Sequence, residues 1–231
     1  MADEPADKPT DAAEESLSRL APLPQGRHGL PREFVTQNQR ERIVTALVDA
    51  VAARGYNATT VGDITKAASV SRRTFYEHFS DKEACFLAAY EMISDHIRSS
   101  MRSAANTFED WPEKVRAALA TMLRFLSAEP ELARIYMIEP IAAGGEIAAR
   151  HQASMQGFAE TLKAGRPERS GERPLPEATE EALVGGIVTL IVREISAGRT
   201  AQLEELLPDL VELALAPYLG SEDAERLARR S

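Results

Sequence analysis

Three helix starts fall within 25 residues of this chain, between positions 59 and 83. Thr60 is followed three residues later by an aspartate, which is a weaker version of the capping box, and Ser71 is placed to cap a second helix. A Ser-x-x-Glu box at residues 80–83 predicts that a long helix begins at Asp81. Two short helices joined by a tight turn are typical of a helix-turn-helix, whose second helix enters the major groove of DNA.

The side chains of the second short helix separate by face. Phe75 and Phe79 are four residues apart and share one side, whereas Arg72, Arg73 and Tyr76 lie together on another. The helix dipole disfavours cations at the first two helical positions, so intrinsic helix stability does not explain the two arginines. Contacts with guanine edges or phosphates explain them. The alternative is that they are solvated surface charges on a structural helical hairpin.

This region resembles the DNA-binding domain of TetR-type transcriptional regulators. The resemblance rests on SRRTFYEHFSDKE at residues 71–83 and on RGYxxTTVxxI at residues 54–64, and it covers residues 37–87 in detail. It implies an all-α fold, with an N-terminal three-helix helix-turn-helix head and a C-terminal helical bundle for regulation and dimerisation. The remainder of the chain matches only in its helix pattern and its ending.

The resemblance also assigns residues to the DNA. The residues implied to contact phosphates are Thr60, Tyr76, His78 and Lys82. The residues implied to contact bases are Thr65, Ser71, Arg72 and Arg73. One departure is Gly62, at an exposed early position of the first motif helix where some family members carry a base-reading side chain. We therefore expect Thr65 to carry most of the base reading from that helix.

The net charge of −9 is unevenly distributed along the chain. Residues 1–24 carry two basic and six acidic side chains, residues 25–82 carry nine and six, and residues 83–231 carry sixteen and twenty-four. The positive charge therefore coincides with the helix-turn-helix. Because the local field governs phosphate attraction over a Debye length of about 8–10 Å, an acidic chain can still bind DNA through a basic face.

The composition of the chain and the positions of its helix-breaking prolines and glycines predict an N-terminal tail, a small N-terminal domain (the head) and a larger C-terminal domain (the body). We expect residues 1–36 to be a disordered acidic tail and a basic arm, 37–80 the helix-turn-helix domain, 81–220 a ligand-binding and dimerisation domain, and 221–231 a C-terminal tail. The predicted body helices span 81–106, 111–128, 130–139, 144–164, 177–198 and 202–219. The first head helix is expected from Gln37 to Arg54. No apolar run reaches the length of a membrane span, no signal peptide precedes the tail, and we expect a cytoplasmic protein.

The last two predicted helices are apolar on more than one side, which requires two packing neighbours. Gly185 and Gly186 each cost about 1 kcal/mol of helix propensity relative to alanine, and close helix approach explains them. With Leu210 they are the predicted interface of a homodimer. A core internal to one subunit is the alternative.

No catalytic motif or metal-ligand spacing occurs in the sequence, so we expect neither an enzyme nor a cofactor. The single cysteine, Cys85, is expected to be a small buried apolar side chain. The middle helices carry apolar bulk and a few polar groups that suit a pocket for a small hydrophobic or mildly cationic effector. The predicted lining residues are Phe125, Tyr136, Met137, Glu139 and Phe158. The alternative is that these side chains are ordinary core.

Together these patterns favour a ligand-responsive repressor that binds a palindromic DNA operator as a homodimer. In this interpretation the effector changes the separation of the two heads, which must match successive major grooves about 34–36 Å apart. A helical protein that binds or sequesters a small molecule, with a head that no longer binds DNA, is the alternative from another class. The combination of Arg72, Arg73, Tyr76 and Lys82 argues against it.

Overall fold

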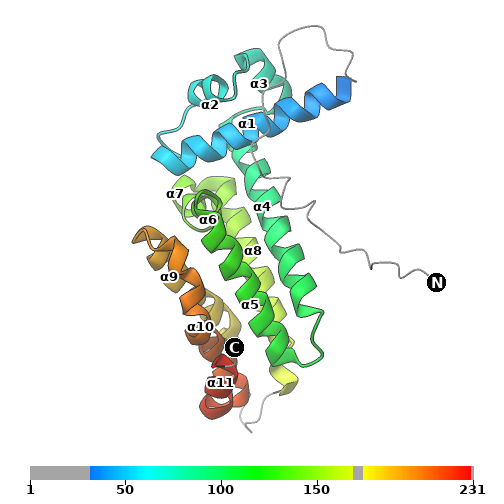
Figure 1. Ribbon diagram of the computed structural model, residues 1–231, viewed down its shortest axis with the longest axis vertical. Coiled ribbons are helices and arrows are strands. Elements are labelled where there is room, and N and C mark those ends of the chain that lie inside the picture. The colour runs from blue at the N-terminus through cyan, green and yellow to red at the C-terminus, as the bar shows by residue number, and fades with distance from the viewer. Residues whose placement is uncertain (1–31, 169–173, 230–231) are drawn as a thin grey trace, which may run out of the picture.

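The computed structural model describes residues 32–168 and 174–229. In this part of the chain the structure is helical. Figure 1 shows α1 to α3 at one end, α4 running from beneath them along the body, and α9 to α11 along the opposite side of the body. The helices of the head are α1 (Arg32–Arg54), α2 (Val61–Ala67) and α3 (Arg72–His78). Those of the body are α4 (Lys82–Ala105), α5 (Trp111–Ala128), α6 (Pro130–Met137), α7 (Glu139–Ala143), α8 (Gly145–Lys163), α9 (Thr179–Ser196), α10 (Leu207–Leu219) and α11 (Ser221–Ala228). Two 3₁₀ segments, η2 (Arg166–Glu168) and η3 (Thr200–Leu206), precede α9 and α10 respectively.

The caps predicted for the two motif helices are present. Thr60 and Asp63 form a reciprocal capping box at the start of α2, and Ser71 accepts a hydrogen bond from the Thr74 amide at the start of α3. Ser69 lies between the two helices with φ of 52°, a left-handed conformation that is uncommon for serine. This turn directs α3 across α2, so that the fully buried Phe75 anchors α3 in the core of the head.

Several predicted boundaries were wrong. The cap of α4 is Asp81, whose Oδ1 accepts from the Ala84 amide at 2.8 Å, and not Ser80. Helix α1 begins at Arg32, within the predicted tail and arm of residues 1–36; the rest of that prediction, residues 1–31, lies outside the described residues. The predicted C-terminal tail contains α11, which packs on α10 with Ala224 fully buried. The predicted helix 130–139 is broken at Ile138 into α6 and α7.

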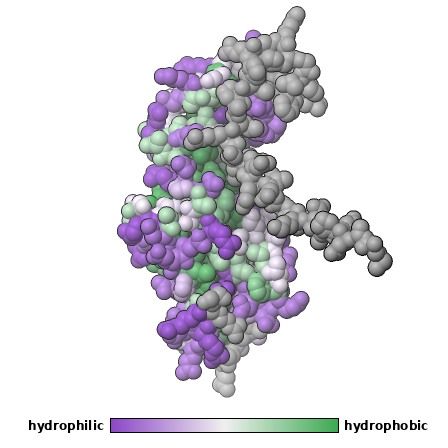
Figure 2. All heavy atoms as spheres, in the orientation of Figure 1, coloured by the Kyte–Doolittle hydropathy of each residue, from purple (hydrophilic) through white to green (hydrophobic). Residues whose placement is uncertain are grey.

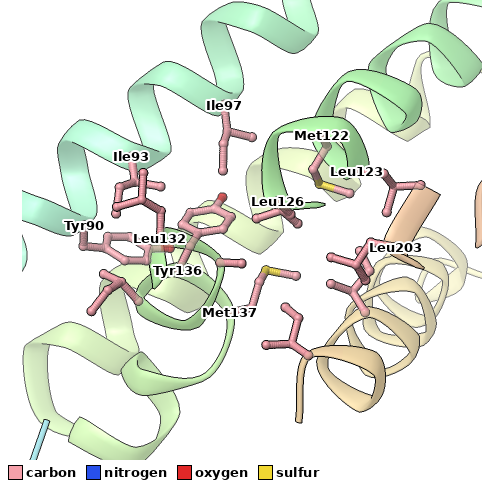
Figure 3. Close-up of a cluster of buried hydrophobic side chains, with 14 of the residues drawn as sticks. Tyr90, Ile93, Ile97, Met122, Leu123, Leu126, Leu132, Tyr136, Met137 and Leu203 are labelled. Atoms are coloured by element: carbon pink, nitrogen blue, oxygen red, sulfur yellow. The ribbon is translucent and has the colours of Figure 1, made fainter. Parts of the chain in front are cut away.

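One apolar core extends through the head and the body. Figure 3 shows how α4, α5 and α6 meet in it, with the Tyr90 and Tyr136 rings side by side and Met137 directed toward Leu203. The two tyrosine rings stack with their centroids 5.3 Å apart. Cys85 is fully buried, as predicted, and burial raises the pKa of its thiol to about 12. Helix α4 packs in this common core and connects the head to the body.

Candidate DNA-binding surface and effector cavity

The start of α3 presents charged side chains at the surface of the head. Arg72, Arg73 and Tyr76 are exposed, and the side chain of Arg73 retains 89% of its accessible surface. Arg73 Nε lies 3.0 Å from Glu77 Oε1 on the next turn, which orients the guanidinium along the helix. Phe75, between these residues, is fully buried. The same helix is therefore anchored on one side and presents two arginines and a tyrosine on the other.

Two residues of α2 differ from what their predicted roles require. Thr65, predicted to contact bases, is only 6% exposed, and its hydroxyl donates to the Gly62 carbonyl at 3.1 Å. In this arrangement the Thr65 side chain is turned into the helix packing and does not face the surface on which Arg72 and Arg73 are exposed. At Gly62, an added Cβ would lie 3.3 Å from Arg72 Nη2. The missing side chain at Gly62 thus leaves the space in which the Arg72 guanidinium lies.

The residues predicted to contact phosphates come from the start of α2, from α3 and from the start of α4. Tyr76 is 56% exposed, Thr60 is exposed at the cap of α2, and Ser71, a predicted base contact, is exposed at the cap of α3. His78 is half-buried with Nε2 3.5 Å from Gln39 Oε1, and burial, with Arg40 nearby, lowers its pKa.

Lys82 is held by the loop that precedes α2. Its Nζ donates to the carbonyls of Tyr56 at 2.8 Å and Thr59 at 2.9 Å, and it lies 3.9 Å from the centre of the Tyr56 ring. An ammonium group has three donors. These two hydrogen bonds leave one donor for a phosphate, and they also tie the loop to α4.

A cavity of about 590 Å³ lies in the body, within the range of small-molecule sites. Its walls are mainly apolar side chains from α4, α5, α6, α8 and α9, and Figure 2 shows apolar side chains along the middle of the body between hydrophilic ones. The charged residues that line it are Arg98, Arg102 and Lys114, and no acidic residue of the described chain is among the lining. Arg98 and Arg102 lie one helical turn apart on α4. The cavity therefore combines apolar walls with three basic side chains, of which Arg98 is ion-paired with Asp95.

Three of the five predicted pocket residues, Tyr136, Met137 and Phe158, line this cavity. Phe125 and Glu139 do not, and their assignment was wrong. Phe125 packs instead against the His96 ring, with centroids 4.9 Å apart. Glu139 is 3% exposed and faces the head. The expectation of a mildly cationic effector rested on Glu139, and it loses its basis.

The basic side chains of the cavity and Trp111 were not predicted from the sequence. They are brought together from α4 and α5, so no local spacing signals them. A buried polar cluster at the cavity wall was not predicted either. There the Tyr136 hydroxyl lies 3.2 Å from Ser154 Oγ, and the neighbouring Tyr90 hydroxyl lies 3.1 Å from His151 Nδ1. Burial lowers the pKa of His151, which favours its neutral form.

The residues predicted for the dimer interface do not share one environment. An added Cβ at Gly185 meets no atom within 4 Å, whereas at Gly186 it would lie 3.5 Å from Leu213 Cδ2 within the same subunit. Leu210 is fully buried inside the subunit, so its assignment to the interface was wrong. Leu213, 36% exposed, is the apolar side chain of α10 that reaches the surface beside Gly186.

Residues 32–168 and 174–229 contain neither a cluster of metal-ligating side chains nor a helix that could span a membrane. No group of three or more His, Cys, Asp or Glu side chains there is suited to hold a metal ion. No helix in the same residues combines the length and apolar character needed to cross a membrane.

Comparison with known proteins decides the family. The family model of bacterial regulatory proteins of the tetR family matches residues 43–89, which contain the helix-turn-helix described above. This chain carries the DNA-binding domain of the TetR family. The family that this domain identifies is one of bacterial regulatory proteins.

The chain is also similar to individual transcriptional regulators. It is 27% identical over 139 residues to the HTH-type transcriptional activator FasR of Mycolicibacterium smegmatis, an alignment that covers 58% of this chain and 64% of that relative. The fatty acid degradation regulator FadR of Bacillus halodurans has the same fold, with a TM-score of 0.68, 21% identity, and coverage of 77% of this chain and 94% of that one. FadR of Bacillus subtilis in complex with stearoyl-CoA gives a TM-score of 0.64 at 20% identity, covering 76% and 96%.

Proposed function

We propose that this TetR-family protein is a ligand-responsive repressor that binds a palindromic DNA operator as a homodimer. The observation that carries the proposal is the start of α3, where Arg72 and Arg73 are exposed on a helix anchored by the fully buried Phe75. A rigid helix that presents arginines from its first turn suits readout of guanine edges in the major groove. Such a role implies a cytoplasmic location.

The contacts of the head divide into two kinds. Ser71, Arg72 and Arg73, in the first turn of α3 and at its cap, are the proposed base contacts. The proposed phosphate contacts are Thr60, Tyr76, His78 and Lys82. Phosphate contacts fix the position of the protein on the duplex, whereas base contacts select the sequence. Substitutions in the two sets should therefore have different effects on specificity and on salt dependence.

The proposed dimer interface is the surface of α9 and α10 around Gly185 and Leu213. Gly185 is open to close approach by another chain, and Leu213 is a large apolar side chain at the surface. For DNA binding, the twofold axis of such a dimer has to place the two copies of α3 on one side. The two heads could then bind half-sites about 34–36 Å apart.

The proposed effector is an amphiphile with an apolar chain and an anionic head group. The apolar walls of the cavity suit the chain, and Arg98, Arg102 and Lys114 suit the anion. The stearoyl-CoA bound to the similarly folded FadR of Bacillus subtilis belongs to this chemical class. Long-chain acyl-CoA is therefore the first compound to test.

The test begins with the intact protein and sheared DNA from its host, from which bound fragments are recovered and sequenced. The recovered fragment is then used in gel-shift titrations with and without stearoyl-CoA, and with an alkyltrimethylammonium of equal chain length as the matched cationic control. We expect stearoyl-CoA to release the fragment and the cationic amphiphile to leave it bound. Release by both compounds would show detergent action, and release by the cation alone would refute the proposed effector class.

Activation of transcription is a second candidate, because the relative FasR is named a transcriptional activator. Both roles use the same head and cavity. A reporter gene driven by the recovered promoter separates them, since deletion of a repressor raises expression and deletion of an activator lowers it. If no fragment is recovered at low salt, the chain is instead a ligand-binding protein with an inactive head.

A further inference from the structure

A buried carboxylate at the junction of head and body accepts hydrogen bonds from both parts. Glu139, the first residue of α7, is 3% exposed. Its Oε2 accepts from the backbone amide of Tyr56 at 2.8 Å, and its Oε1 accepts from Arg134 Nη2 at 2.8 Å. Burial of a charge is costly unless the charge is paired and hydrogen-bonded. Glu139 is thus held by the body through Arg134 and holds the head through Tyr56.

The loop at residues 55–60, which Glu139 of α7 contacts, is also held by residues of α4. Lys82 at the start of α4 donates to two of its carbonyls, and the Tyr56 ring packs edge-on against Phe86, also on α4. The loop ends at Thr60, the cap of α2. A displacement of α7 relative to α4 would therefore shift the loop and, through Thr60, the helix-turn-helix.

Residues that line the cavity are close in sequence to Glu139. Tyr136 and Met137, the last residues of α6, line the cavity, and only Ile138 separates them from Glu139. A cavity occupant that pushes on Met137 also moves the corner between α6 and α7. Interactions that have two discrete arrangements can transmit such a shift between sites.

We propose that Glu139 couples occupancy of the cavity to the position of the DNA-binding head through its hydrogen bond to the Tyr56 amide. This inference rests on the proposed function of the cavity as an effector site. In this role Glu139 is a positioning residue, since it contacts neither the cavity nor the DNA surface. The Arg134 ion pair serves to fix the carboxylate on the body.

The test needs neither the operator nor the natural effector. Gly157 lines the cavity in α8, and a Cβ there meets no atom within 4 Å, so Gly157→Phe adds a large apolar side chain at the cavity wall without a clash and serves as a tethered probe of occupancy. Stearoyl-CoA serves as a separate, soluble probe. The readout is hydrogen–deuterium exchange of the peptide that spans residues 55–60 in the full chain, which reports opening of the Tyr56 amide contact.

Three substitutions at Glu139 distinguish the hydrogen bond from the charge. Glu139→Gln keeps an oxygen that can accept from the Tyr56 amide but removes the charge. Glu139→Asp keeps the charge, which Arg134 can follow, but withdraws the oxygens by one methylene. Glu139→Leu removes both. Asn57→Ala is the control, because it removes the adjacent head–body bond from Asn57 Nδ2 to the Ala142 carbonyl at 3.1 Å.

With Glu139 or Gln at this position, either occupant should change the exchange rate of residues 55–60 by about fivefold or more, the lower end of typical couplings between sites. With Asp or Leu the change should fall below about twofold, which is the additivity expected of uncoupled sites. Asn57→Ala should respond like the parent protein. If Leu prevents folding, the contrast between Gln and Asp decides alone.

An unchanged response in the Asp and Leu proteins would overturn the inference, as would a response in Asp and none in Gln. Loss of the response in Asn57→Ala as well would assign the coupling to the whole junction and not to Glu139. If Gly157→Phe acts and stearoyl-CoA does not, the proposed effector class fails while the coupling stands. If neither occupant changes the loop of the parent protein, the coupling itself is refuted.

Discussion

Replacement of Gly165 by alanine should destabilise the body by a defined steric route. Gly165 is buried between α8 and η2, and an ideal Cβ there would lie 2.1 Å from Trp111 Cζ2 and 2.3 Å from Cη2. Ordinary contact begins at 3.4 Å, so the indole must move by more than an ångström. The ring is rigid, and its other neighbours include Tyr218, with ring centroids 4.9 Å apart.

The expected magnitude follows from overpacking of a core, which costs about 1–3 kcal/mol. For a chain of this size each kcal/mol lowers the melting temperature by about 2–4 °C, so we expect a decrease of about 2–12 °C. Trp111 is the single tryptophan of the chain and lines the cavity. Its emission should therefore report the displacement directly, in the same thermal scan.

Gly157→Ala is the matched control. Gly157 is inside α8, where an added Cβ meets no atom within 4 Å, and alanine there should stabilise the helix by up to about 1 kcal/mol. If Gly165→Ala melts at the parent temperature with unchanged tryptophan emission, the contact with Trp111 is not tight and the reasoning is refuted.

Three further predictions concern DNA, assembly and pH. Arg73→Ala should weaken specific operator binding by about 1–3 kcal/mol without changing the non-specific salt slope, whereas Lys82→Ala should reduce the slope by about one phosphate; equal slopes for both proteins would contradict this assignment. Leu213→Asp should lower the mass measured by light scattering to that of one subunit, and an unchanged mass would place the interface elsewhere. The pKa of His151 is lowered in the folded state, so the unfolded state binds the proton more readily. The stability that neutral His151 contributes is therefore fully present above the unfolded pKa of about 6.5. This stability is lost as the pH falls below that value. Calorimetry from pH 7.5 to 5.5 should show a shallower loss of stability for His151→Gln than for the parent protein, by at most about 1.4 kcal/mol per pH unit, and an equal loss would refute the assignment.

The helix starts of the head were predictable because capping is a local chemistry. Thr60 and Ser71 cap the helices that their spacing predicted. At α4 two adjacent residues could cap, and only the backbone geometry selects Asp81 over Ser80. Helix α11 was missed because alanines such as Ala224 and Ala228 form its buried face and give little hydrophobic contrast. Gly220, with φ of 86°, reads as the end of the last helix although another follows.

The cavity was predictable only in part, because its walls depend on how separate helices are rotated against each other. Met122 and Phe125 lie three residues apart on α5, yet Met122 lines the cavity and Phe125 packs against His96. Periodicity identifies an apolar face but not its partner. Thr65 shows the same limit in the head, because the resemblance assigns a position in the motif and not the direction of the side chain.

Glu139 illustrates why the link between the two parts of the molecule has to be polar and could not be read from the sequence. Its head partner, the Tyr56 amide, is 83 residues away. Apolar contacts such as Tyr56 on Phe86 are non-directional and permit sliding, so they hold head and body together without fixing one register. Hydrogen bonds are directional and weaken steeply when misaligned. A buried carboxylate that accepts hydrogen bonds from both a backbone amide and a guanidinium therefore specifies one arrangement of the junction. Any second arrangement must break these hydrogen bonds together.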